Sequence, residues 1–103
     1  MDYQKMIIVG NSTKDAEIHQ SEGRVGYADF TLGVTRTKDQ STFFPIRVFG
    51  KLAESWEMVK KGVKVLVDGK LDISEYTDKE GQKRISFRIL ADTYRLLQRQ
   101  RGG

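Results

Sequence analysis

Alternating apolar and polar positions over residues 42–49 form the clearest pattern in the chain. The two rows of this segment are Phe44, Ile46 and Val48 on one side, and Phe43, Pro45, Arg47 and Phe49 on the other. A strand sends successive side chains to opposite faces. We therefore predict a strand whose first row enters a core and whose second row turns two aromatic rings and a guanidinium outward. The alternative is that Phe43 or Phe49 packs under a neighbouring loop or subunit.

A short apolar run, Met6-Ile7-Ile8-Val9, predicts the first strand. Both of its faces are apolar, which indicates burial on both sides. One face can meet the domain core, and a second subunit is one candidate cover for the other. Gly10-Asn11 predicts a bulge or turn, after which residues 16–19 resume the strand.

A second strand is predicted over residues 26–35, and a polar loop over residues 36–41. The inward row of this strand is Ala28, Phe30, Leu32 and Val34, and the opposite row is Tyr27, Asp29, Thr31, Gly33 and Thr35. Its glycines allow the sharp bend that a small barrel needs.

A period of two returns over residues 63–74 and again over residues 84–91. The predicted inward rows are Val63, Val65, Val67, Gly69, Leu71 and Ile73, and then Ile85, Phe87, Ile89 and Ala91. Between the two segments, Asp78-Lys79-Glu80-Gly81 is a strong turn signal. The pair is predicted to form a long hairpin with a protruding, charged tip.

Residues 50–62 change to a helical period. Leu52, Trp56 and Val59 form the apolar stripe of a short helix, with Lys60 and Lys61 in its last turn and Gly62 as its C-terminal cap. We interpret Trp56 as a core anchor rather than a base-stacking residue. Five bent strands with a helix between the third and fourth are typical of the OB-fold, so we predict an all-β Greek-key barrel.

Composition narrows the classes of function. The 103 residues suffice for one domain, cysteine is absent, and His19 is the single histidine. We interpret His19 as a surface residue, because no second histidine or cysteine stands at metal-ligand spacing. No phosphate-binding loop or nucleophile motif occurs, so we expect no enzyme, metal or cofactor. The sequence contains no run of about 20 apolar residues, so it predicts no membrane span.

The formal charge of +4 mildly favours an anionic partner. Exposed rings stack on bases whatever their identity, and cations follow the sugar–phosphate backbone. Because duplex DNA hides its base faces, exposed rings favour single strands. The predicted stacking residues are Phe43, Phe49 and Tyr76, and the predicted phosphate contacts are Arg47, Lys64, Lys70, Arg84 and Arg88.

Several short motifs, in this order and spacing, resemble the homo-oligomeric single-stranded DNA-binding proteins of bacteria and mitochondria. The resemblance spans about residues 4–97. Its motifs are Ile8-Val9-Gly10-Asn11, Phe30-Thr31-Leu32, Phe43-Phe44, Val48-Phe49-Gly50-Lys51-Leu52-Ala53-Glu54, Lys61-Gly62, Val67-Asp68-Gly69-Lys70-Leu71, Tyr76-Thr77-Asp78 and Gly81-Gln82-Lys83.

The resemblance implies that Phe43, Phe49 and Tyr76 stack bases, positions that the alternation reaches independently. It also implies that the first strand pairs between subunits, with Met6 and Ile8 at the interface of a homotetramer built as a dimer of dimers. The implied role is to coat and protect single-stranded DNA in replication, recombination and repair. The expected location is the cytoplasm, on the nucleoid, with an organellar location as the alternative.

Two departures from the family keep other functions open. The chain divides into a predicted OB-fold domain at residues 1–97 and a short basic, glycine-containing tail at residues 98–103, and the acidic tip that recruits partner proteins in relatives is not found. Relatives often carry tryptophan where this chain has Phe43 and Tyr76, so weaker stacking is expected. The alternatives are an OB-fold adaptor subunit of a primosome-like assembly and an RNA-binding OB domain.

Overall fold

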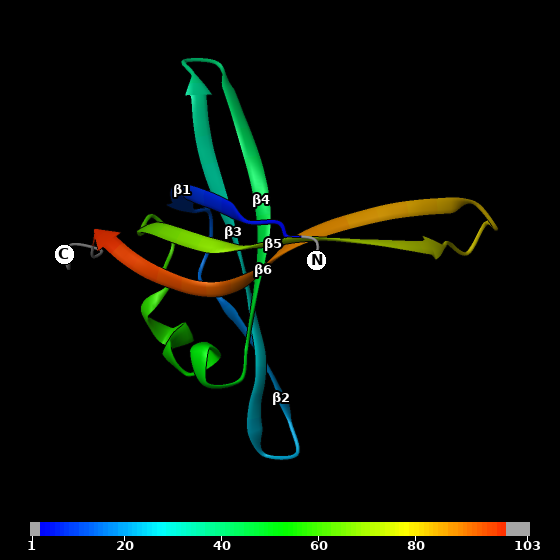
Figure 1. Ribbon diagram of the computed structural model, residues 1–103, viewed down its shortest axis with the longest axis horizontal. Coiled ribbons are helices and arrows are strands. Elements are labelled where there is room, and N and C mark those ends of the chain that lie inside the picture. Colours follow the sequence, from blue (N-terminus) through cyan, green and yellow to red (C-terminus); the bar gives the residue numbers. More distant parts are fainter. Residues whose placement is uncertain (1–2, 99–103) are drawn as a thin grey trace.

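The structure, a computed structural model, describes residues 3–98. The described residues form six strands and one helix, in the order shown in Figure 1. Their bounds are β1 Met6–Ser12, β2 Glu17–Ser21, β3 Arg24–Thr37, β4 Gln40–Phe49, η1 Gly50–Met58, β5 Lys64–Thr77 and β6 Lys83–Gln98. The predicted tail at residues 98–103 lies outside the described residues except for Gln98, where β6 ends.

The strands close into a barrel. The sheet order is β1-β5-β6-β4-β3-β2, and β1 also pairs with β3, which joins the ends of the five-stranded ring β1-β5-β6-β4-β3. Strand β2 extends this wall beyond β3. Among the strand pairings of residues 3–98, only that of β4 with β6 is parallel, and the others are antiparallel. The predicted all-β OB-fold is confirmed. The segment expected to resume the first strand is instead a separate strand, β2, so the helix that was predicted between the third and fourth strands lies between β4 and β5.

Small and branched apolar side chains fill the barrel interior around one buried aromatic ring, Phe30. The buried residues of the core are Ile8, Ala16, Ala28, Phe30, Leu32, Ile46, Val48, Ala53, Val59, Val63, Val65, Val67 and Ile89. The predicted inward rows of β3 and β4 are confirmed, since Val34 and Phe44 also pack against this cluster.

Helix η1 packs against β2, β3 and β4. Its apolar stripe meets the core, where Leu52 and Trp56 are half-buried, so the interpretation of Trp56 as a core anchor is confirmed. The predicted end of the helix is wrong. The helix is of the 3-10 type and ends at Met58, and Lys60 begins a separate turn in which Gly62 has a φ of 90°. No helix among the described residues is long and apolar enough to cross a membrane.

Three hairpins project from the barrel in different directions (Figure 1). The predicted loop at residues 36–41 is wrong, because β3 continues to Thr37 and pairs there with Gln40, at the start of β4. Only Lys38 and Asp39 remain as the turn. The polar side chains of this segment are therefore those of a solvated two-stranded arm.

The β5–β6 hairpin projects as predicted, but part of its predicted inward row is wrong. Ile73, Ile85 and Phe87 are exposed by 59%, 70% and 47%. Their alternation is regular, since Ile73 pairs with Phe87. Beyond Leu71 and Ile89, however, the two strands have left the barrel, so this face of the arm has no core to meet.

Strand β1 runs without a break through Gly10, so the predicted bulge or turn there is wrong. A Cβ at Gly10 would lie 2.7 Å from the carbonyl oxygen of Gly33, so glycine is needed for the close approach of β1 and β3. The predicted interface residues are also corrected. Ile8 is buried in the core and Met6 packs against it, because their row faces inward.

Candidate nucleic-acid interface

Two phenylalanine rings stand on the outer face of β4. Phe43 is 56% exposed and Phe49 is 50% exposed, as the alternation predicts. On the neighbouring strand β3, Gly33 is the cross-strand partner of Phe43. A Cβ at Gly33 would lie 3.3 Å from Cε1 of Phe43, so the ring rests against bare backbone. Both rings keep surface available for stacking.

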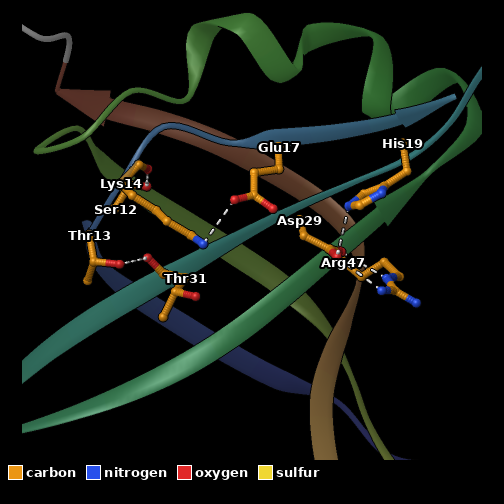
Figure 2. A network of polar contacts seen from close by, with 8 residues as sticks. All are labelled: Ser12, Thr13, Lys14, Glu17, His19, Asp29, Thr31 and Arg47. Atoms are coloured by element: carbon orange, nitrogen blue, oxygen red, sulfur yellow. Dashed lines mark hydrogen bonds and ion pairs between the residues drawn. The ribbon is translucent and has the colours of Figure 1, made fainter.

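Arg47 lies between these rings in the sequence, and its guanidinium is fixed by neighbours on β3. Nε donates to Oδ1 of Asp29 over 2.8 Å, and Nη2 donates to Oδ2 over 3.0 Å (Figure 2). The guanidinium carbon also lies 4.1 Å from the ring centroid of Tyr27. The hydrogen bonds that Arg47 donates to Asp29 raise the pKa of Arg47. The guanidinium of Arg47 is therefore fixed in orientation and paired with a carboxylate, unlike a freely mobile surface cation.

Tyr27 and His19 extend the aromatic surface from β4 across β3 to β2. The rings of Tyr27 and Phe49 are 6.0 Å apart and tilted, whereas His19 stacks on Tyr27 at 4.6 Å with an interplanar angle of 19°. His19 Nε2 also lies 3.7 Å from Oδ2 of Asp29. Tyr27 and Asp29 lie on the predicted outward row of their strand, but the sequence alone does not indicate that either belongs to the site.

Tyr76 lies on the β5–β6 arm and is 52% exposed. Its cross-strand partner is Arg84. The Nε of Arg84 donates to Oδ2 of Asp78 over 2.9 Å, and Oδ1 of Asp78 accepts from the backbone N–H groups of Glu80 and Gln82. These bonds, first of all the one from Arg84, lower the pKa of Asp78. The tip of the arm is therefore an ordered turn.

The other three predicted phosphate contacts differ from Arg47 and Arg84. Lys64 and Lys70 are exposed, and Arg88 is half-buried. In the part of the chain that the structure describes, none of the three forms an ion pair, whereas Arg47 and Arg84 each do. Lys64 lines a hollow with Gly33, close to the Phe43 end of the wall.

A cavity of about 250 Å³ opens between the outer face of β4 and the base of the β5–β6 arm. It brings Arg47 and Arg88 together, although they lie on different strands. The residues around it are Lys14, Glu17, Asp29, Phe30, Thr31, Pro45, Ile46, Arg47, Phe87 and Arg88. We call this cavity the β4 recess.

The family model described as "Single-strand binding protein family" matches residues 3–97. The chain belongs to this family. Among its relatives, the single-stranded DNA-binding protein of Aquifex aeolicus is 35% identical over 107 residues, which cover 95% of this chain and 72% of that protein. The single-stranded DNA-binding protein of Wolinella succinogenes is 31% identical over 104 residues, which cover 92% of this chain and 64% of that protein. The chain thus spans slightly less than two thirds of the Wolinella protein.

The fold of this single-strand binding family member is also similar to a solved mitochondrial structure. The mitochondrial single-stranded DNA-binding protein Rim1 of S. cerevisiae superposes with a TM-score of 0.78 and 24% identity. The match covers 97% of this chain and 100% of that one. The family and the fold that the sequence motifs predicted are both confirmed.

Proposed function

We propose that this chain binds single-stranded DNA with little regard for sequence, and that it coats and protects exposed strands in replication, recombination and repair. The expected setting is a bacterial cytoplasm or an organelle. One observation carries the proposal: Phe43, Phe49 and Tyr76 are each about half exposed on a barrel of the single-strand binding protein family. Each stacked base contributes about 1–3 kcal/mol in proteins of this kind.

The cations around these rings divide into two groups with different proposed roles. Lys64, Lys70 and Arg88 bind phosphates, because none of them forms an ion pair with a carboxylate among the described residues. Arg47 and Arg84 also contact the strand, but Asp29 fixes the orientation of Arg47 and Asp78 fixes that of Arg84. Their net charge toward DNA is correspondingly smaller.

The proposal is tested by replacing each ring with alanine. Phe43→Ala, Phe49→Ala and Tyr76→Ala should each weaken binding to fluorescent oligo-dT, read by anisotropy, by about fivefold or more. Ile85→Ala is the control, because Ile85 is 70% exposed and lies on the other face of the arm from Tyr76. Wild-type affinity in all three ring variants would refute the assignment.

The single tryptophan offers an independent check of the DNA path. Trp56 belongs to η1 and packs against the core, whereas the rings of Phe43 and Phe49 are exposed on the outer face of β4. We expect its fluorescence to change little when oligo-dT binds. Strong quenching would place the bound strand across the helix instead of across β4.

We also propose that the protein is a homotetramer, a dimer of dimers, that uses β1 as one interface. Strand β1 pairs with β5 along Met6–Asn11 but with β3 only at Asn11 and Ser12, so much of one edge offers unpaired backbone groups. Such an edge is a template for another strand. Ile7 and Val9 are 67% and 41% exposed on the outward face, so these two side chains replace Met6 and Ile8 as the proposed interface.

Light scattering tests the assembly. Wild-type protein should have the mass of four chains, and Ile7→Lys should lower it, because a charge at this position opposes pairing of β1 with a second β1. A monomeric wild-type protein would refute the proposed interface without bearing on the role of the rings.

The exposed apolar face of the β5–β6 arm, formed by Ile73, Ile85 and Phe87, favours a second candidate function. An OB-fold adaptor would use such a face for protein contact in a primosome-like assembly. Titration with oligo-dT, duplex DNA and oligo-U separates the candidates. Preference for oligo-dT supports DNA binding, tighter binding of oligo-U supports the RNA alternative, and no binding supports the adaptor.

A further inference from the structure

The β4 recess lies on the proposed DNA track, between the two phenylalanine rings of β4. Pro45 and Arg47 line it, and both belong to the outward row that begins with Phe43 and ends with Phe49. Its volume of about 250 Å³ is just below the ~300–1,000 Å³ of pockets for drug-sized ligands. A space of this size suits one heterocyclic ring system rather than several stacked bases.

The walls of the recess combine flat and apolar surfaces with carboxylates. Arg47 forms one side and is braced by Tyr27, while Pro45 and Phe87 supply apolar surface. Asp29 also lines the space. Each of its oxygens accepts one hydrogen bond from Arg47. Oδ2 also lies 3.7 Å from Nε2 of His19. A carboxylate oxygen can accept more than one hydrogen bond, so Asp29 can still accept one from a ring that enters the recess.

We propose that the β4 recess receives one base of the bound strand and favours bases with an exocyclic amino group over thymine. This proposal rests on the proposed function. Carboxylates only accept hydrogen bonds, and they pair with the amino group of cytosine in DNA recognition. Adenine and guanine also carry an amino group, whereas thymine has none. Glu17, whose Oε1 accepts from Lys14 over 3.2 Å, adds a second carboxylate to the lining.

The position of Asp29 supports this assignment. A carboxylate on a surface that binds phosphates opposes binding by charge repulsion. The side chain of Asp29 is 33% exposed, so its charge is accessible to the bound strand. Arg47 offsets that charge and fixes the carboxylate plane. The alternative role for Asp29 is to brace Arg47 alone, and in that case its removal would affect all bases equally.

The test compares two homopolymers of equal length, oligo-dC and oligo-dT, on wild-type protein and on Asp29→Ala. We expect the variant to lower the ratio of oligo-dC affinity to oligo-dT affinity by about fivefold. Release of the Arg47 charge acts on phosphates, which both strands share, so it cancels in the ratio. Glu57→Ala on η1 removes the same charge from an exposed site and should leave the ratio unchanged.

A second variant leaves the Asp29–Arg47 pair intact. Thr31→Leu adds bulk to the recess wall and should lower the same ratio, with thermal melting used to confirm that each variant is folded. A ratio unchanged from wild type in both variants would overturn the recess proposal. If Phe49→Ala still weakens oligo-dT binding, only the recess proposal fails. If Phe43→Ala, Phe49→Ala and Tyr76→Ala all leave oligo-dT binding unchanged, the proposed function itself fails.

Discussion

The two halves of the β5–β6 hairpin follow the same alternation of side chains but lie in opposite environments. In the barrel half, Val65, Val67 and Ile89 are fully buried. In the arm half, Ile73 and Ile85 continue the same rows and are exposed by 59% and 70%. Alternation therefore indicates which side chains share a face, but it does not indicate whether anything covers that face.

The two strands pair irregularly on the barrel side of the boundary between these halves, just before Leu71 and Ile89. The register of β5 and β6 shifts between Asp68 and Gly69, which marks an irregularity in the ladder. Such bulges bend a strand and increase its twist. A Cβ at Gly69 would collide with the carbonyl group of Leu90, so the close approach of the strands at this point requires glycine.

The largest expected effect comes from a matched pair of substitutions on one face of β6. Ile89→Ala should lower the free energy of unfolding by about 2–5 kcal/mol, because it leaves a cavity in the core. Ile85→Ala should change it by about 0.5 kcal/mol or less, since its side chain is already in solvent. Urea unfolding measures both. Equal losses would show that the arm face is covered, as it would be in an assembly that buries it.

Much of the fold could be predicted because the inward rows of β3 and β4 consist mainly of large apolar residues, which are expected in a core. Phe30 and Ile46 follow the alternation into the core as expected. The arms could not be predicted in the same way. Thr37 and Gln40 are polar in either a loop or a solvated hairpin, and Ile85 has the same side chain as Ile89. Only the closure of the barrel decides where its interior ends.

Gly69→Ala should disturb the close pairing of β5 and β6 on the barrel side of the boundary. The added methyl group must displace backbone rather than a flexible side chain, and overpacking of this kind costs about 1–3 kcal/mol. At the tip of the arm, Gly81 has a φ of 81° but nothing within 4 Å of its Cβ position. Gly81→Ala should therefore strain the turn locally. In urea unfolding, a global loss for Gly81→Ala that matches the loss for Gly69→Ala would contradict this distinction.

The candidate site divides in a similar way between what alternation predicts and what it does not. The exposure of Phe43 and Phe49 follows from the alternation of side chains in one strand. The Asp29–Arg47 pair needs the register between β3 and β4, in which these two residues are direct partners. Without that register, the sequence indicates only that Arg47 is an outward cation that could bind phosphate, as Lys70 is. No pattern in the sequence predicts the recess beside Arg47.

Salt dependence should separate a cation at the base of the arm from one at its tip. Lys70→Gln removes a cation without a carboxylate partner among the described residues, and it should make the log–log slope of oligo-dT affinity against salt shallower by about 0.7. Arg84→Gln should change the slope by less, because Asp78 already offsets the charge of Arg84. Equal changes in slope for the two variants would show that DNA displaces Asp78 from Arg84.

The smallest expected effect is confined to the tip and follows the ionisation of Asp78. Its pKa is lower in the folded arm than the value of about 3.9 in an unfolded chain, so the bonds to Arg84, Glu80 and Gln82 favour the ionised form. This stabilisation is complete above the unfolded pKa and is lost as the pH falls through the folded one. In an NMR titration, the amide signals of Glu80 and Gln82 should therefore shift with a midpoint below about 3.9. Arg84→Gln should raise that midpoint, because it removes the largest cause of the depression, whereas Ile89→Ala should leave it unchanged in the protein that remains folded. A midpoint at the unfolded value in wild-type protein would mean that the turn is not held by Asp78, and the arm would then differ from the barrel in local order as well as in burial.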